Sequence, residues 1–355
     1  MRSFTHELVT GRVVFGSGAL SQVADEVRRL GVRRVLLVAG RHARRYADRI
    51  GDEIGGLLAG RIEEAAQHVP AEVADDATRR AEEAAADLLL CVGGGSATGL
   101  AKAVAHTRGT PILAVPTTYA GSEMSDIWGI TEGHRKTTGR DPGVRPVVVV
   151  YDPELTLSMS PELTATSGMN ALAHDVEALY APNPSPVVTL IAEESIRVLA
   201  RALPVCVDRP DDLAGRSDAL YGAFLSGVAM GNTVMGVHHK ICHVLGGAYR
   251  LPHSGVHSAV LPYATAYNRE AAPEAMCRIA AALAATDAAV GLWGLARRIG
   301  APTDLVSLGF DPALIPEVAA EVSGARTTNP RPVTDDSIRE LLRAACAGAS
   351  PVPTT

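Results

Sequence analysis

The chain has 355 residues, of which 47% are hydrophobic and 4% aromatic, and its formal net charge is −6. This length exceeds one ordinary hydrophobic core and favours two domains. Because proteins that bind nucleic acids generally neutralise phosphates with an excess of Lys and Arg, the negative charge argues against a nucleic-acid partner.

The cysteines and the hydrophobic runs indicate the compartment. Five cysteines are scattered along the chain without a CxxC pair, which is typical of free thiols in a reducing compartment. No apolar run reaches the roughly 18 residues that a spanning helix needs, and the N-terminal residues lack the apolar core of a secretory signal. We therefore expect a cytoplasmic protein without a membrane partner.

Residues 1–155 alternate short apolar runs with amphipathic helical patterns. Apolar runs at 33–40, 110–118 and 145–155 each end in turn residues, and residues 71–96 read as a helix that leads into a buried strand. Uninterrupted apolar strands separated by helices predict a parallel sheet covered on both faces.

After the first 155 residues the pattern changes to a period of 3.6, so residues 156–355 predict an all-helical second domain. Breaks rich in Pro and Gly separate the helices. We expect helices at 160–181, 187–203, 217–232, 234–248, 255–270, 273–285, 289–299, 313–323 and 335–347.

The stretch "LLLCVGGGSATGLAKAV" places Gly94, Gly95 and Ser96 between a buried strand and a helix that we expect to begin near Ala97. Glycines there let the backbone approach a pyrophosphate, and the amides of the helix start supply donors. A tight turn without a ligand would fit this loop equally well.

A second strand end favours the nucleotide interpretation. "PTTYAGSEMS" places Thr117, Thr118 and Ser122 after the next parallel strand. Open parallel sheets bind ligands beyond the carboxyl ends of their strands. Two small, hydroxyl-rich loops at neighbouring strand ends therefore predict a nucleotide crevice.

Residues 236–257, "GVHHKICHVLGGAYRLPHSGVH", hold five of the eleven histidines. His239 and His243 share a helix face at i, i+4, and Asn170 and His174 repeat that spacing on an earlier helix. Together with His253, such imidazoles could gather around a divalent cation.

The alternative is that His238 and His257 are solvated surface residues and that the other histidines are bonded in the core. For a single histidine this alternative usually holds. Two i, i+4 pairs in a helical domain that accompanies a nucleotide site favour a functional cluster.

Five stretches resemble the iron-containing alcohol dehydrogenase family in matching order over essentially the whole chain. They are "VGGGSATGLAKA", "PTTYAGSE", "DPEL", "GMNALAHDVEALYA" and "HHKICHVLGGAYRLPHSGVHSAVLP". The fourth and fifth are most similar to the maleylacetate reductase branch. The resemblance implies a Rossmann-like nucleotide-binding α/β domain, an all-α C-terminal domain as in dehydroquinate synthase-like proteins, and an active site in the cleft between them.

The resemblance also implies a nicotinamide cofactor, with its pyrophosphate on the glycine loop and a lysine near the nicotinamide ribose. The residues that would contact this cofactor are Gly94, Gly95, Ser96, Thr117, Thr118, Ser122 and Lys136.

The residues at the end of the first apolar run bear on the choice between NADH and NADPH. Family members restricted to NAD carry an Asp there, whereas this chain has Gly40 followed by Arg41. Without the carboxylate a 2′-phosphate is not repelled, and Arg41 could pair with it. We expect NADPH to be accepted alongside NADH, the alternative being that Arg41 is a solvated charge.

In typical members an aspartate and three histidines hold a metal. His174, His239 and His253 match the histidines, while Asn170 replaces the aspartate. A neutral amide oxygen is a poorer ligand for a hard divalent cation, and Asp175 points about 100° away from its neighbour His174 around the helix. We therefore expect that Fe or Zn is not required.

The resemblance implies reduction of the conjugated C=C of maleylacetate, a small dicarboxylate, to 3-oxoadipate in the degradation of aromatic compounds. Hydride would go to the alkene carbon β to the ketone, and the resulting enolate would need hydrogen-bond donors and a proton. We assign His243 as polariser or proton donor, assisted by His239 or His253, because the pKa of histidine lies near neutral pH.

The two substrate carboxylates need cationic or polar partners. Lys240, which we also group with the catalytic residues, is the first candidate, although a solvated helix face would suit it equally. The other candidates for substrate contact are His238, Arg140, Asn170 and His174.

Three other functions remain open. A metal-dependent alcohol or aldehyde oxidoreductase would polarise a carbonyl with Zn²⁺ or Fe²⁺, against which Asn170 argues. A dehydroquinate synthase-like cyclase or lyase would need a complete metal site and a basic phosphate-binding set. A binding or scaffold role would leave both loops and the histidines unexplained. A homodimer is the commonest assembly and is expected here.

Overall fold

The computed structural model describes residues 6, 11–63, 65, 69–133, 135–182 and 185–352, without the side chains of residues 135 and 136. The chain divides into two compact units. One comprises Leu8–Ser158, and the other comprises Met159–Thr355 together with Met1–Glu7. Among the described residues no helix is both long enough and apolar enough to cross a membrane.

The first unit is built around a six-stranded parallel sheet with strand order β1-β8-β5-β4-β2-β3. Every residue of the four inner strands is buried, which explains their uninterrupted apolar sequences. The strands are β1 (Arg12–Phe15), β2 (Val35–Ala39), β3 (Leu58–Glu63), β4 (Leu88–Gly93), β5 (Ile112–Pro116) and β8 (Val148–Tyr151).

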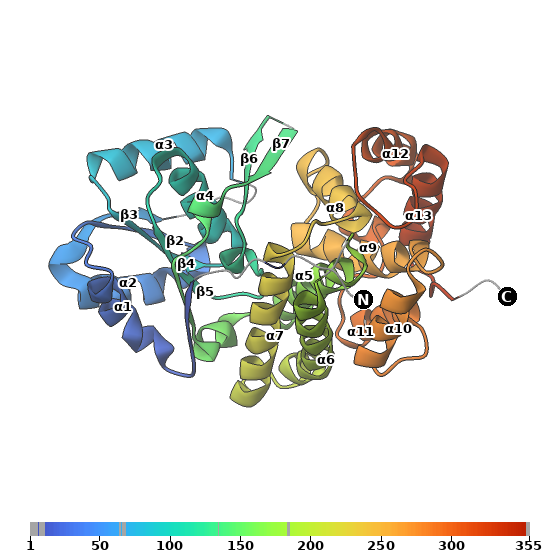
Figure 1. Cartoon of the computed structure of the whole chain (residues 1–355), viewed down its shortest axis with the longest axis horizontal. Helices are drawn as coiled ribbons and strands as arrows, with labels where there is room; N and C mark the ends of the chain where they lie inside the picture. Colours follow the sequence, from blue (N-terminus) through green and yellow to red (C-terminus); the bar gives the residue numbers. More distant parts are fainter. Residues whose placement is uncertain are drawn as a thin grey trace. The chain divides into compact units, whose positions relative to one another are not determined.

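Helices cover both faces of this sheet (Figure 1). Alternate strand residues such as Leu37, Leu90 and Val115 pack against α1 (Val23–Arg29) and α2 (Arg44–Ile54). The opposite face carries α3 (Ala71–Glu83) and α4 (Gly95–Arg108), and α4 packs against β4 and β5. The predicted α/β domain is confirmed, and its helix after the glycine loop begins two residues earlier than expected.

An antiparallel hairpin of β6 (Ile127–Glu132) and β7 (Arg135–Arg140) forms a separate two-stranded sheet. The sequence pattern did not predict it. Its strands are rich in polar residues and Gly and lack a buried apolar face, so hydrophobic periodicity carried no signal there.

The second unit is helical, as predicted (Figure 1). Five of its helices begin with a side-chain cap, at Ser160, Ser185, Asp212, Asp287 and Thr334. The helices are α5 (Pro161–Tyr180), α6 (Pro186–Asp208), α7 (Leu213–Gly231), α8 (Val237–Gly247), α9 (His253–Tyr267), α10 (Pro273–Ala282), α11 (Ala288–Arg298), α12 (Ile315–Gly324) and α13 (Asp335–Ala347).

One expected helix break is wrong. The proline at position 204 predicts an end near 203, yet α6 continues through Pro204 to Asp208. A proline this close to a helix end removes one backbone hydrogen bond and leaves the last turn able to form.

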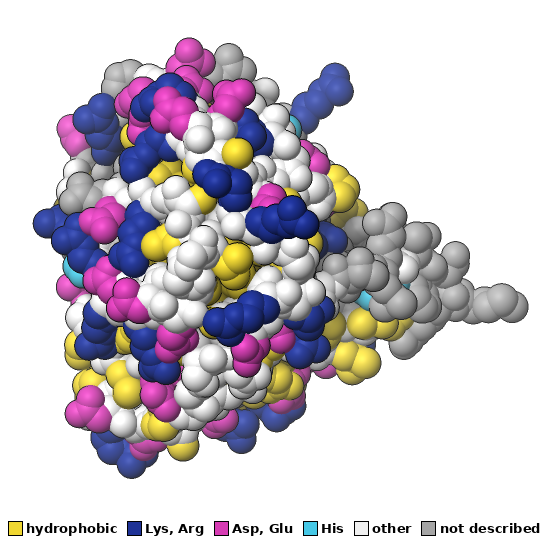
Figure 2. Space-filling view, turned by 90° about the vertical axis from the view of Figure 1, so that its left-hand side faces the viewer, with side chains coloured by type: hydrophobic (Ala, Val, Ile, Leu, Met, Phe, Trp, Pro, Cys, Tyr) yellow, Lys and Arg dark blue, Asp and Glu magenta, His cyan; other side chains and the backbone are white. Residues whose placement is uncertain are grey.

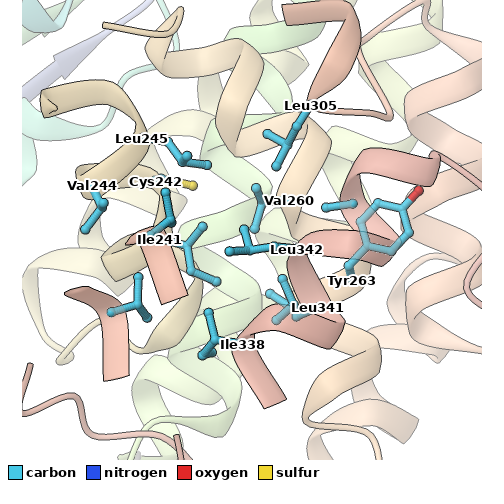
Figure 3. Close-up of a cluster of buried hydrophobic side chains, with 14 of the residues drawn as sticks. Ile241, Cys242, Val244, Leu245, Val260, Tyr263, Leu305, Ile338, Leu341 and Leu342 are labelled. Carbon is cyan, nitrogen blue, oxygen red and sulfur yellow. The ribbon is translucent and has the colours of Figure 1, made fainter. Parts of the chain in front are cut away.

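An apolar cluster fixes the orientation of α8, the helix that carries most of the clustered histidines. Ile241, Val244 and Leu245 pack with Val260 of α9 and Leu342 of α13 (Figure 3). Each such buried side chain contributes about 1.5–3 kcal/mol. Because this face of α8 is committed to the core, His239 and His243 are turned towards another side of the helix.

Basic and acidic side chains are interspersed on the molecular face shown in Figure 2. That face therefore lacks the single-signed patch on which a nucleic-acid interface would depend.

Candidate active site

The helical unit contains a buried carboxylate that organises the histidines. Asn170, His174 and Glu177 stand at i, i+4 and i+7 on α5 and so share one helix face. The side chain of Glu177 is fully buried. Its Oε2 accepts hydrogen bonds from the backbone N–H of Gly236 at 2.9 Å and from Nδ1 of His239 at 2.6 Å.

The other oxygen, Oε1, accepts from the backbone N–H of His238 at 2.9 Å. Glu177 therefore caps the start of α8, whose N-cap residue Gly236 has no side chain to do so. A Cβ at position 236 would lie 3.0 Å from Oε1 of Glu177, so a glycine allows this close approach. Negative charge at a helix N-terminus is favourable, which offsets part of the cost of burying the carboxylate.

Hydrogen bonds fix the tautomers of two neighbouring imidazoles. His239 donates from Nδ1 to Glu177, which leaves a lone pair on Nε2, a buried atom without a partner. Nδ1 of His174 lies 3.2 Å from Oγ of Ser226, whose hydroxyl donates to the carbonyl of Ala171. His174 must therefore also donate from Nδ1. Both rings, with centroids 5.1 Å apart, carry their lone pairs on Nε2.

His257 completes the cluster, and sequence reasoning did not select it. Its Nδ1 lies 3.0 Å from Nε2 of His238, and its ring centroid lies 4.5 Å from that of His253 and 4.8 Å from that of His239. His238 and His257 are both buried, so the alternative that they are solvated surface residues is wrong. The i, i+4 spacing of His253 and His257 was the available signal.

Burial keeps much of the cluster neutral. Desolvation lowers the pKa of His174, His238 and His257 well below the usual range, and the neighbouring histidines lower it further. A neutral His238 directed at His257 is better suited to supporting its neighbour than to binding a substrate carboxylate.

Three of the four catalytic candidates are more accessible than the buried histidines of the cluster. His243, His253 and Lys240 are each partly exposed, whereas His239 is buried. The ring centroids of His239 and His243 are 6.1 Å apart. A substrate can therefore contact His243 or Lys240 without unfolding the helix that carries them.

The histidines could hold a metal ion. The nearest ligand atoms of His238, His239 and His257 all lie within 4.8 Å of one another. Oδ1 of Asn170 is buried without a hydrogen-bond partner, as a free oxygen donor would be. Asn170 offers a neutral amide oxygen, however, where a hard cation prefers a carboxylate, and the carboxylate of Glu177 is bonded to His239 and to backbone amides.

Asp175 does not supply that carboxylate. Its Oδ2 accepts a hydrogen bond from Oγ of Ser195 on α6 at 2.6 Å. Burial raises the pKa of Asp175 well above its usual value, which favours the protonated acid.

In the α/β unit, three strand ends meet at the proposed nucleotide loop. Gly93 has φ of 150°, and a Cβ there would lie 3.1 Å from the backbone nitrogen of Gly40. A Cβ at Gly94 would lie 3.0 Å from the side chain of Thr118. The N-cap Gly94 offers no side-chain cap to α4, so the first amides of the helix are available to an anion.

Lys102 stabilises the loop that carries Ser122. Its ammonium is fully buried and donates to the carbonyls of Ser122, Ser125 and Ile127 at 2.6, 2.8 and 3.0 Å. Burial lowers the pKa of Lys102 to about 7, even though the nearby charge of Glu123 acts to raise it. Lys102 thus shapes the loop from within, a role that the sequence did not reveal.

Two further candidates belong to the hairpin of the α/β unit. Arg140 on β7 forms an ion pair with Asp126 at 2.7 Å, so its charge is partly engaged. Lys136 lies opposite Thr131 in the β6–β7 register, and its side chain is outside the described part of the chain. The substrate candidates Asn170, His174 and His238 belong to the helical unit.

Comparison with known proteins agrees with the fold of both units. The model for the iron-containing alcohol dehydrogenase family matches residues 10–153, and the model for the C-terminal part of Fe-containing alcohol dehydrogenases matches residues 164–346. These matches place the protein among the oxidoreductases. The chain belongs to the iron-containing alcohol dehydrogenase family, which implies a nicotinamide cofactor.

Individual relatives indicate a more specific relationship within this family. The chain is 43% identical to a maleylacetate reductase of Pseudomonas sp. (strain P51), covering 99% of this chain and 100% of that protein, and 46% identical to one of Burkholderia cepacia with the same coverage. It is also similar to the crystal structure of maleylacetate reductase from Agrobacterium tumefaciens, with 41% identity, a TM-score of 0.94 and coverage of 99% and 100%. The resemblance recognised in the sequence is confirmed, and the protein is a maleylacetate reductase-like enzyme.

Proposed function

We propose that this enzyme reduces the conjugated C=C bond of maleylacetate to give 3-oxoadipate, with NADH or NADPH as reductant. Full-length similarity to maleylacetate reductases carries the proposal. The match of both halves of the chain to alcohol dehydrogenase models weighs against the cyclase or lyase alternative.

A reduced nicotinamide supplies a hydride when it is bound, and the alkene carbon β to the ketone would receive it. The protein must then stabilise the enolate oxygen and protonate the α carbon. His243 is the proposed proton donor because it is partly exposed and adjoins the buried cluster. Lys240, three residues earlier on α8, is the proposed partner of a substrate carboxylate.

His239 is suited to assist at the enolate. When protonated it would donate from Nε2, while Glu177, bonded to Nδ1, would balance the positive charge. A preoriented donor is more effective than water, because it needs no reorganisation as charge develops. His253 adjoins this group through His257 and is the proposed alternative assistant.

A metal-dependent alcohol or aldehyde oxidoreductase is the second candidate, favoured by two buried ligand atoms without a hydrogen-bond partner, Nε2 of His239 and Oδ1 of Asn170. His174, His239 and His253, with Asn170, would hold Fe²⁺ or Zn²⁺, which would act as a Lewis acid on a carbonyl oxygen. The neutral Asn170 favours the proposal that maleylacetate reduction does not require the ion.

The experiment follows NADH and NADPH oxidation at 340 nm by EDTA-treated protein, with maleylacetate as substrate and a simple aldehyde as comparison. Rapid oxidation with maleylacetate alone supports the proposal. Activity on the aldehyde alone, restored by Zn²⁺ or Fe²⁺, would replace it with the metal-dependent function. His243→Asn should abolish most turnover, whereas His106→Asn, a change of the same kind at an exposed side chain that is hydrogen-bonded to Asp141, should not. A homodimer remains a prediction, which light scattering would check.

A further inference from the structure

A polar cavity opens at the carboxyl ends of β2 and β3. It has a volume of about 310 Å³ and is lined by Ala39, Gly40, Arg41, Arg44 and Glu63. The guanidinium groups of Arg41 and Arg44 and the carboxylate of Glu63 therefore surround this cavity. Its lining residue Gly40 lies against Gly93 of the proposed dinucleotide loop.

Strand register explains why Glu63 reaches this cavity. Ala39, the last residue of β2, pairs with Glu63, the last residue of β3. In parallel-sheet dinucleotide sites, a carboxylate at the end of the strand beside the glycine-loop strand binds the adenosine ribose, and β2 is the neighbour of β4 here. Here the residue after β2 is Gly40, and the nearest carboxylate stands on the adjacent strand.

Arg44 holds that carboxylate in an ion pair with its Nη2. The Arg44 side chain is 61% exposed and that of Glu63 is 38% exposed. An ion pair so accessible to water is weak and exchanges partners readily. Arg41, in the same cavity, is exposed as well and adds a second positive charge.

We propose that the Arg44–Glu63 pair selects between a ribose 2′-hydroxyl and a 2′-phosphate. With NADH, Glu63 accepts a hydrogen bond from the 2′-hydroxyl and keeps Arg44. With NADPH, the phosphate competes with Glu63 for Arg44 and gains Arg41, since guanidinium groups bind phosphate through paired hydrogen bonds. This inference rests on the proposed use of a nicotinamide cofactor and adds the residues that set its choice.

The test is equilibrium binding of NADH and NADPH, followed by the fluorescence of the reduced nicotinamide, so that it does not depend on substrate turnover. Competition by adenosine 2′,5′-bisphosphate and by AMP isolates the adenosine end. Glu63→Gln removes the competing charge, and we expect it to tighten NADPH about tenfold relative to NADH. Arg44→Met should shift the same ratio about tenfold in the opposite direction.

Matched controls on α2 separate this local effect from a change in overall charge. Glu53→Gln removes a carboxylate that pairs with Arg49, and Arg45→Met removes a cation that contacts Tyr46. Both should change the two cofactor affinities by the same factor. The double variant of Arg44 and Glu63 should show less than the sum of the two single effects, because each residue acts through the other.

A selectivity ratio that stays at the wild-type value in both single variants overturns the inference, and so does a shift of equal size in the controls. If the wild-type protein binds neither cofactor, the proposed use of a nicotinamide fails instead. The two failures are therefore distinguishable in one experiment.

Discussion

Oε2 of Glu177 lies 2.6 Å from Nδ1 of His239 and 2.9 Å from the backbone nitrogen of Gly236. One carboxylate thus orients an imidazole of the site and caps the helix on which that imidazole stands. The position of the ring and the start of α8 are therefore coupled through a single buried group.

Glu177→Gln should impair both functions of this group. The amide oxygen can still accept two hydrogen bonds, but the NH₂ group would face a backbone N–H that now bonds the other carboxylate oxygen, and an unsatisfied buried group costs about 1–3 kcal/mol. We expect a lower midpoint of urea unfolding and a fall in kcat of about 10–100-fold, as for other residues that orient active-site histidines. Glu270→Gln, at an exposed position, is the control. Equal kcat in the two variants would contradict the assigned role.

Acid should destabilise the helical unit through its buried histidines. The folded-state pKa values of His174, His238 and His257 are lowered, so the unfolded chain binds more protons below about pH 6.5. The free energy of unfolding therefore falls as pH decreases below that value, by up to about 1.4 kcal/mol per pH unit for each histidine.

The pKa values of Asp175 and Glu123 are raised, so acid stabilises the fold through these two groups. The contribution of one histidine is therefore isolated by comparing the wild type with a variant that lacks it. Urea unfolding at pH 7.5, 6.5 and 5.5 should give a shallower pH dependence for His257→Asn than for the wild type. Parallel curves would show that His257 does not remain neutral in the folded state.

Asn170→Asp should increase the affinity for divalent metal. The change is isosteric and places a carboxylate where a buried amide oxygen lacks a partner. We expect Zn²⁺ or Fe²⁺ to bind at least about tenfold more tightly, because a charged oxygen donor completes the histidine set. Metal retained after dialysis, measured by plasma mass spectrometry, checks this. Asn232→Asp, at the end of α7, controls for added charge, and equal retention in both variants would count against the site.

Lys102→Met should weaken the α/β unit. The substitution keeps much of the side-chain volume but leaves the carbonyls of Ser122, Ser125 and Ile127 without their donor. A loss of about 2–4 kcal/mol in the free energy of unfolding is expected, since several buried acceptors are affected. Urea denaturation measures it, with the exposed Arg33→Met as the control. Unchanged stability in Lys102→Met would mean that water replaces the ammonium.

Local pattern was sufficient for most of the fold. Continuous apolar runs predicted the inner strands β2, β4, β5 and β8, and the 3.6-residue period predicted α5 to α13. Each of these two sequence patterns arises within a single helix or strand, because it depends only on which side of that element is buried. The β6–β7 hairpin lacked such a side, and Pro204 suggested a break that the end of α6 tolerates.

The site was less predictable, because it depends on which helices meet. The spacing of His239 and His243 identified one helix face from the sequence. Glu177 could be linked to His239 only once α5 was known to pack beside the start of α8. Likewise, Arg44 and Glu63 become partners only through the adjacency of β2 and β3.

The ammonium of Lys102 serves the Ser122 loop as a bound alkali cation serves other loops, with carbonyl oxygens arranged around it. Unlike a free ion, it is attached to α4 and cannot be diluted away, exchanged or removed by a chelator. The shape of this loop should therefore be indifferent to the ionic composition of the medium, and EDTA treatment tests the histidine cluster without disturbing the loop.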